Sequence, residues 1–278
     1  MDVRSFVHAN LEAPEVGSFA GGTVALFTAP APGKETPNED ACALVPLDGS
    51  SGVLVVADGA GGMPGGEEAA AIAIDRVTRA ISWEEGDADS LRARIVDGIE
   101  AANEAIRELT RGAASTLAVA EIRDGSMRSY HVGDSMIFVT GQRGRVKHQT
   151  VSHSPVGYAV ESGMIDEEEA VHHEERHVVS NLLGSPDMRI EIGPSVPLAA
   201  RDTLVLASDG LFDNFYFEEI VEHVRKGPLE TVAWALVDQA RRRMRRPEDV
   251  RPGKSDDLAF LVFRPGRRTR RRTESRPD

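Results

Sequence analysis

The order of its segments most constrains how this chain can fold. Short apolar runs rich in β-branched residues, bounded by Gly, Pro or Asp, come in adjacent groups, as is typical of strands. Two long helical patterns then follow each other directly, at residues 67–82 and 89–110, with no strand between them. Strands grouped in hairpins and helices grouped in pairs favour antiparallel sheets covered by helices over a doubly wound parallel sheet.

The individual elements follow from periodicity and turn signals. Strands are expected at residues 22–28, 41–47, 52–57, 115–123, 127–132, 135–141, 203–208 and 258–263. The Asp124-Gly125 pair between two of these runs is a strong hairpin signal. Apolar residues recur at helical spacing from Ala70 to Ile81, and a further helix is expected at residues 229–246.

Composition sets the size of the core and the expected compartment. With 278 residues and 41% hydrophobic content, the chain can bury a full core as one large domain or two small ones. No apolar run approaches the roughly 20 residues of a transmembrane helix, and the N-terminus lacks a signal-peptide pattern. The single Cys42 rules out an intramolecular disulfide framework and fits a reducing compartment. We therefore expect a cytoplasmic protein.

The balance of charge argues against nucleic acid as the main ligand of the folded body, because the net charge is −13. Basic residues gather at residues 241–246 and from residue 264 onward, and the second stretch has the composition of a disordered tail. Contact of these runs with anionic lipid, nucleic acid or an acidic partner is the alternative to a solvated face. We favour the solvated face and expect no specific nucleic-acid partner.

Aspartates recur where predicted strands end or turn. They are Asp40, Asp58, Asp209 and Asp256 at strand ends, and Asp134 in the turn between two meander strands. Gathering several carboxylates at one end of two sheets is costly without cations, and hard ions such as Mg²⁺ or Mn²⁺ prefer oxygen ligands. The alternative is that each aspartate only caps a turn, which is the usual role of a single Asp-Gly pair. The repetition of Asp-Gly at residues 58 and 209 favours the cation site.

Six motifs in order carry a family resemblance. They are NEDA (38–41), VADGAGG (56–62), STL (115–117), HVGDS (131–135), SDGLFD (208–213) and SDDLAFLVF (255–263). This set resembles that of bacterial members of the metal-dependent Ser/Thr protein phosphatases of type 2C, the PPM family. Residues 153–184 are similar to the family's flap-bearing stretch. The resemblance covers residues 18–264 and leaves an N-terminal extension (1–17) and an Arg-rich disordered tail (265–278).

The resemblance implies an α+β fold, a four-layer α-β-β-α sandwich of two antiparallel sheets flanked by helix pairs. It also implies two divalent ions, Mg²⁺ or Mn²⁺, and a weaker third. The implied ligands are Asp40, Asp58 bridging both ions, the carbonyl of Gly59, Asp209 and Asp256, with Asp134 for the third ion. Glu39 would act in catalysis by orienting a metal-bound water. A metal-bridging hydroxide would attack phosphorus directly, which agrees with the absence of a Cys-based nucleophile motif.

Departures from the family pattern concern the substrate more than the metals. The arginine that clamps the substrate phosphate is replaced by Glu35, which leaves Lys34 as the nearest base and the predicted phosphate contact. Ser152 stands in place of an aspartate, and Asp257 in place of an asparagine. His153 is the histidine we expect to approach the leaving group as an acid. The remaining histidines of this region are given structural or solvent roles.

Three hypotheses about function remain at this point. The favoured one is that the chain, as a monomer, hydrolyses phosphoserine and phosphothreonine in protein substrates of a Ser/Thr kinase. The second is a catalytically weak or inactive regulator that binds a phosphoprotein or kinase, motivated by Glu35. The third is hydrolysis of a small phosphomonoester with the same metals. Within the flap, we expect residues 152–169 to govern substrate choice and residues 171–184 to be structural.

Overall fold

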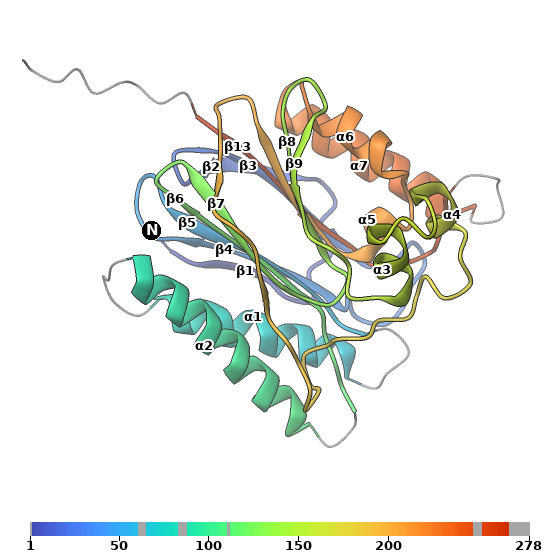
Figure 1. Cartoon of the computed structure of the whole chain (residues 1–278), viewed down its shortest axis with the longest axis horizontal. Helices are drawn as coiled ribbons and strands as arrows, with labels where there is room; N and C mark the ends of the chain where they lie inside the picture. The colour runs from blue at the N-terminus through green and yellow to red at the C-terminus, as the bar shows by residue number, and fades with distance from the viewer. Residues whose placement is uncertain (1, 61–64, 83–87, 110–111, 247–251, 267–278) are drawn as a thin grey trace, which may run out of the picture.

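Two antiparallel sheets lie face to face in the computed structural model, which describes residues 2–60, 65–82, 88–109, 112–246 and 252–266 (Figure 1). The first sheet runs in the order β1 (Arg4–Phe6), β4 (Asp40–Pro46), β5 (Gly52–Asp58), β6 (Leu117–Arg123), β7 (Ser126–Val132) and β10 (Glu191–Ile192), and β11 (Val196–Pro197) also pairs with β7. The second runs β2 (Glu15–Phe19), β3 (Gly22–Ala29), β13 (Leu258–Pro265), β12 (Thr203–Ala207), β8 (Met136–Thr140) and β9 (Val146–Gln149).

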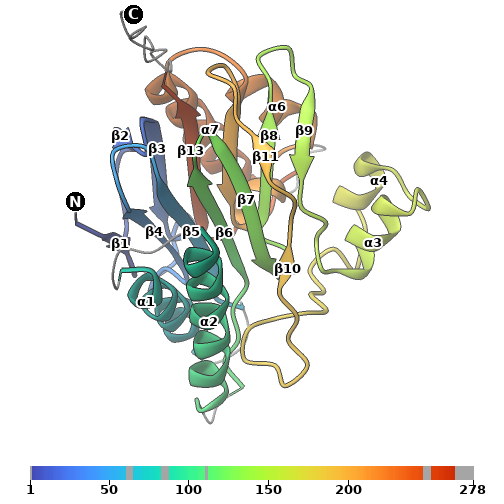
Figure 2. The same ribbon diagram turned by 60° about the vertical axis from the view of Figure 1, so that its left-hand side comes forward.

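Two helix pairs cover the outer faces of the two sheets. The helices of the described residues are α1 (Gly66–Ser82), α2 (Ala88–Arg107), α3 (Pro155–Glu161), α4 (Glu167–Val171), α5 (Asp209–Phe212), α6 (Phe217–Val224) and α7 (Leu229–Met244). Helices α1 and α2 lie against the first sheet, and α6 and α7 lie against the second (Figure 2). Among the described residues, none of these helices combines the length and the apolar character needed to span a bilayer.

Alternation along the strands explains the layers. In β5, Val53 and Val55 pack with the α1–α2 pair, whereas Leu54 and Val56 point between the sheets. Side chains of a strand alternate between faces, so a run that is apolar at every position must be covered on both sides. A third cluster lies between the second sheet and α6–α7. The predicted four-layer α-β-β-α sandwich is confirmed.

Residues of the predicted N-terminal extension, 1–17, contribute strands to both sheets. Strand β1 pairs with β4, and β2 pairs with β3, so residues 4–19 add an edge strand to each sheet. These short runs, RSF and EVGSF, gain their strand geometry from backbone pairing with a longer neighbour rather than from an apolar pattern. The structured part of the sandwich therefore begins before residue 18.

Candidate metal centre

Asp40 and Asp58 face each other across neighbouring strands. Asp40 begins β4 and Asp58 ends β5, and the antiparallel register pairs the two residues directly. Asp40 is 1% exposed, and its Oδ2 accepts a 2.6 Å hydrogen bond from the hydroxyl of Ser208, which follows β12 of the second sheet. The hydrogen bond ties the two sheets together at the edge where both carboxylates lie.

Asp209 and Asp256 reach the same edge from the second sheet. Asp209 is the first residue of α5, directly after β12, and Asp256 lies just before β13, the partner strand of β12. A Cβ atom on Gly210 would lie 1.8 Å from the carbonyl oxygen of Asp257, so only glycine allows this approach. The second Asp-Gly pair thus brings Asp209 beside Asp256.

The Asp58-Gly59 pair also ends in close backbone packing. The N–H of Gly59 donates to the carbonyl of Glu39 at 3.0 Å. A Cβ atom on Gly59 would lie 2.1 Å from the carbonyl oxygen of Gly66, so glycine lets the start of α1 approach the end of β5. Residues 61–64 of the predicted glycine loop lie outside the described residues.

Two further carboxylates belong to this cluster. Asp134 lies in the turn between β7 and β8, and its burial, followed by the negative charge of Asp209, raises its pKa to about 7. Carboxylate oxygens of Asp209, Asp213 and Asp256 lie within 4.8 Å of one another. In the sequence, Asp213 stands out only as the last residue of the SDGLFD motif. Its i, i+4 spacing from Asp209 across α5 is the signal that identifies it as a neighbour.

Burial and mutual repulsion raise the pKa values of the cluster. The pKa of Asp58 is held well above its usual value by burial, then by the charges of Asp40 and Asp209. Burial likewise raises the pKa of Asp40 well above its usual value. The pKa of Asp209 is raised by burial and Asp213, and that of Asp256 by burial and Asp209. Each ionised carboxylate therefore lacks sufficient compensating charge.

Lys254 supplies a positive charge inside the cluster. Its Nζ lies 2.9 Å from Asp209 Oδ2, 2.9 Å from Asp213 Oδ2 and 2.7 Å from Asp256 Oδ2. Burial lowers the pKa of Lys254, but the charges of the three aspartates outweigh burial and raise the pKa above its usual value. The sequence analysis did not single out Lys254, because the loop that carries it has no periodicity.

Lys34 is held by two other carboxylates. Its Nζ lies 2.6 Å from Glu39 Oε2 and 2.7 Å from Asp257 Oδ2. Asp257 is buried and also accepts hydrogen bonds from the backbone N–H groups of Ala31 and Glu39, at 2.8 and 2.7 Å. The aspartate that replaces the family's asparagine therefore pairs with the lysine beside Glu35. The predicted contact of Lys34 with substrate phosphate stays a prediction.

The donor set at this edge fits hard divalent cations. Carboxylates from both sheets converge there, supplied by Asp40, Asp58, Asp134, Asp209 and Asp256. Their raised pKa values mean that a divalent cation would relieve repulsion between the ionised forms. Oxygen-only sites suit Mg²⁺ and Mn²⁺ rather than metals that favour thiolate or imidazole ligands.

His153 has a structural environment. Its ring stacks on that of His131 with centroids 4.3 Å apart. Its Nδ1 accepts hydrogen bonds from the backbone N–H of Gly133 at 3.1 Å and from the side-chain amide of Asn181 at 2.8 Å, while Nε2 lies 3.2 Å from Glu191. Both ring nitrogens are therefore engaged within the protein. The predicted contact of His153 with the leaving group stays a prediction.

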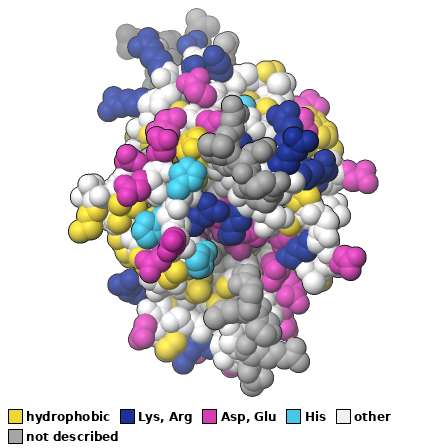
Figure 3. Space-filling view, turned by 90° about the vertical axis from the view of Figure 1, so that its right-hand side faces the viewer, with side chains coloured by type: hydrophobic (Ala, Val, Ile, Leu, Met, Phe, Trp, Pro, Cys, Tyr) yellow, Lys and Arg dark blue, Asp and Glu magenta, His cyan; other side chains and the backbone are white. Residues whose placement is uncertain are grey.

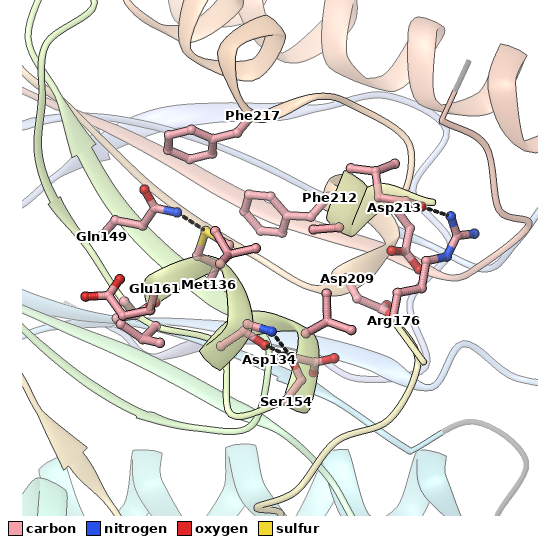
Figure 4. A pocket seen from close by; sticks show the side chains of 18 of the residues that line it. Asp134, Met136, Gln149, Ser154, Glu161, Arg176, Asp209, Phe212, Asp213 and Phe217 are labelled. Carbon is pink, nitrogen blue, oxygen red and sulfur yellow. Dashed lines mark hydrogen bonds between the residues drawn. The ribbon is translucent and has the colours of Figure 1, made fainter. Parts of the chain in front are cut away.

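A cavity of about 280 Å³ opens between the flap, residues 152–184, and the aspartate cluster. Figure 4 shows Phe212, Phe217 and Met136 on one side of this cavity and Asp209 and Asp213 on the other. Helices α3 and α4 of the flap contribute to its lining. The cavity thus combines an apolar wall with the acidic edge of the centre.

The two halves of the flap differ in their attachment. Leu183 is fully buried and exchanges backbone hydrogen bonds with Ser115, and the side chain of Asn181 binds the backbone of Arg189. This supports the predicted structural role of the second half, although Val178 in that half is 38% exposed. The face that carries the flap shows Lys and Arg side chains meeting Asp and Glu side chains at its middle, with histidines beside them (Figure 3).

Sequence comparison places these features in a known group. The profile of a family described as "Protein phosphatase 2C" matches residues 32–249. The "Protein phosphatase PhpP" of Streptococcus pneumoniae is 31% identical over 180 residues, which span 60% of this chain and 70% of that protein. The "Serine/threonine phosphatase stp" of Listeria welshimeri is 28% identical over 185 residues, spanning 63% of this chain and 72% of that protein.

Structural comparison agrees on the fold. The serine/threonine phosphatase PstP/Ppp of Mycobacterium tuberculosis superposes with a TM-score of 0.70 at 24% identity, covering 88% of this chain and 98% of that one. A PstP catalytic domain described as a complex with 2 manganese ions superposes with a TM-score of 0.68 at 23% identity, covering 87% of this chain and 96% of that one. The fold is therefore shared with these structures.

Proposed function

Because this chain belongs to the protein phosphatase 2C family, we propose that it hydrolyses phosphoserine and phosphothreonine in proteins, acting as a monomer on substrates of a Ser/Thr kinase. The observation that carries the proposal is the convergence of aspartates from both sheets at one edge. Asp40 and Asp58 come from the first sheet, and Asp209 and Asp256 from the second. This arrangement provides a phosphate-binding centre once its repulsion is relieved by cations.

The metal assignments follow the positions of these carboxylates. Asp40, Asp58, Asp209 and Asp256, with the carbonyl of Gly59, would hold two divalent ions, and Asp134 would help hold a weaker third. When bound, two such ions supply an activated water as nucleophile and offset the charge of the phosphoryl group. Asp58 would contact both ions, which is supported by its direct pairing with Asp40 across the strands and by the effect of the Asp209 charge on its pKa.

The remaining roles belong to the chain's own side chains. Glu39 would orient the attacking water, and Lys34 fixes its carboxylate through a 2.6 Å ion pair. Asp257 fixes the backbone of Glu39 through its N–H. The buried Asp257 holds Lys34 and the backbone of Glu39 in place, which lowers the cost of ordering them around the substrate.

The proposal is tested by a comparison of substrates. We expect phosphate release from a phosphothreonine peptide to exceed release from sugar phosphates at equal concentration, with p-nitrophenyl phosphate as a size control. A strong preference for a sugar phosphate would contradict the assignment to proteins and support a small phosphomonoester as substrate.

A second candidate is a weakly active or inactive regulator that binds a phosphoprotein or kinase. Two observations favour it: Glu35 stands where the family has its clamping arginine, and the ammonium of Lys34 is already paired with two carboxylates. Turnover of p-nitrophenyl phosphate with Mn²⁺ separates the two, because a regulator of this kind would bind a phosphopeptide without hydrolysing it.

Restoring the arginine tests what limits substrate binding. Glu35 is exposed and repels a phosphate dianion, so Glu35→Arg should lower KM for p-nitrophenyl phosphate about tenfold, or ~1.4 kcal/mol. The matched control is Glu100→Arg, which makes the same change of charge on the exposed face of α2 and should leave KM unchanged. An unchanged KM for Glu35→Arg would show that phosphate is bound by another residue.

The flap supplies a separate prediction about substrate size. Tyr158 lies on α3 and is 41% exposed, so it is available to a protein substrate. Tyr158→Ala should lower kcat/KM for a phosphoprotein about fivefold, or ~1 kcal/mol, because aromatic side chains are enriched among the interface residues whose truncation is costly. Turnover of p-nitrophenyl phosphate should not change. Equal losses with both substrates would mean that Tyr158 supports the catalytic centre or the fold.

A further inference from the structure

The ammonium of Lys254 lies among three carboxylates that could bind a metal ion. One carboxylate oxygen from each of Asp209, Asp213 and Asp256 lies within 4.8 Å of the other two, a spacing suited to a single metal ion, and Lys254 contacts all three side chains. The ammonium is 2.7–2.9 Å from one oxygen of each, so its hydrogen-bond donors use all three carboxylates at once. Two of these carboxylates belong to the ligand set proposed above.

The backbone of Lys254 is held by hydrogen bonds, whereas its side chain is partly exposed to solvent. Asn214 is fully buried, accepts the N–H of Lys254 at 3.1 Å and donates to its carbonyl at 2.9 Å. The same amide donates to the carbonyl of Gly210 at 2.9 Å, which ties this loop to α5. The side chain of Lys254 is 29% exposed on a flexible four-carbon stem. Its ammonium therefore has a path to solvent that leaves the backbone in place.

An ammonium and a divalent ion cannot use the same carboxylate oxygens together. Each competes for the Oδ2 atoms of Asp209, Asp213 and Asp256, and their positive charges repel at such short range. We propose that Lys254 is a built-in competitor of the divalent metal for these three carboxylates, and that metal loading requires its ammonium to move out. This inference rests on the proposed function insofar as Asp209 and Asp256 bind metal.

The competition has a measurable consequence. When a binding-competent state is only partly populated, apparent affinity falls in proportion to that population. If the ammonium leaves the carboxylates about a tenth of the time, the apparent Kd for Mn²⁺ is about tenfold weaker than that of the bare site. The chain would thus bind the metal at about tenfold higher free metal concentration than the aspartates alone would require.

Lys254→Met removes the charge and keeps the length of the side chain. We expect isothermal titration calorimetry of the chelator-stripped full chain to show Mn²⁺ binding about tenfold tighter in Lys254→Met than in the wild type. The matched control is Lys147→Met, which removes the ion pair with the buried Asp202 on another part of the second sheet and should leave the Kd for Mn²⁺ unchanged.

Thermal stability, measured without and then with Mn²⁺, is a second readout that tests the same idea without activity. In EDTA, Lys254→Met should melt about 3 °C lower than the wild type, because three carboxylates lose their counter-charge. Saturating Mn²⁺ should then raise its Tm by more than it raises that of the wild type. Lys254→Arg keeps the charge and should bind Mn²⁺ no more tightly than the wild type, which covers the case in which Lys254→Met fails to fold without metal.

The outcomes separate this inference from the proposed function. Absence of Mn²⁺ binding in both the wild type and Lys254→Met would overturn the metal centre itself. Equal Mn²⁺ affinity in the two proteins, or weaker binding in Lys254→Met, would overturn only the role of Lys254. An unchanged Mn²⁺ affinity together with a raised KM would assign Lys254 to the substrate phosphate, and that result also contradicts the proposal.

Discussion

Replacing Asp58 with asparagine is expected to reduce turnover of a phosphothreonine peptide by about 10³-fold or more while the fold survives. Changes to the partners of metal ligands alone typically cost 10- to 100-fold, and Asp58 is proposed to touch both ions. The amide has nearly the same shape as the carboxylate, so the pairing of β4 with β5 should be retained. Initial rates with saturating Mn²⁺ measure the loss.

The stability of Asp58→Asn should move in the opposite direction from its activity. Burial and neighbouring carboxylates make the ionised form of Asp58 unfavourable, so a neutral amide removes repulsion with Asp40 and Asp209. In EDTA the variant should melt at or above the Tm of the wild type. Asp124→Asn, in the exposed turn after β6, is the matched control and should change neither activity nor Tm. Activity retained by Asp58→Asn would remove Asp58 from the centre.

Arg243→Met is expected to lower the free energy of unfolding by about 2 kcal/mol, or Tm by about 4–8 °C. Arg243 is 9% exposed, and its guanidinium makes paired contacts with the carboxylate of Glu219 at 2.8 and 2.9 Å. It also donates to the carbonyl of Asn214 at 2.6 Å. Removing one partner of a buried pair is costly, and the partial exposure of Glu219 keeps the expected loss below the largest values for such pairs.

The neighbouring arginine provides the control. Arg242 is exposed on the same helix, so Arg242→Met should change the free energy of unfolding by less than about 0.5 kcal/mol. Thermal or urea denaturation of both variants makes the comparison. Equal effects would mean that the basic run at residues 241–246 acts only through its net charge and that the Glu219 contact adds nothing.

The sheet and helix pairs followed from sequence because their residues repeat with clear periods. The buried face of α1 contains the apolar positions from Ala70 to Ile81 that its pattern marks, and β5 differs from its predicted run by one residue. The edge strand β9, VKHQ, alternates half-buried and exposed side chains over too short a run to be recognised. Helix α6 was also missed, because its eight residues span little more than two turns.

At the centre, sequence identified the residues at strand ends and missed those brought in by tertiary packing. Asp40 and Asp58 were predictable as strand ends that an antiparallel register places opposite each other. Lys254 was not, because its approach depends on the contact of Gly210 with Asp257 and on the buried amide of Asn214. A periodic pattern in the sequence cannot predict a contact between a loop and a helix terminus that lie far apart in the chain. The buried ion pair of Arg243 with Glu219 was also missed, because Arg243 lies within a basic run that is typical of an exposed helix face.

The central claim is that the aspartate cluster binds the divalent ions that phosphoester hydrolysis requires. The most direct test is phosphate release from a phosphothreonine peptide by the full chain after exhaustive chelation, followed by titration with Mn²⁺ and Mg²⁺. We predict no release in EDTA and recovery of activity as either ion reaches roughly the millimolar range, as hard oxygen-ligand sites lead one to expect. Full activity after exhaustive chelation would contradict the claim.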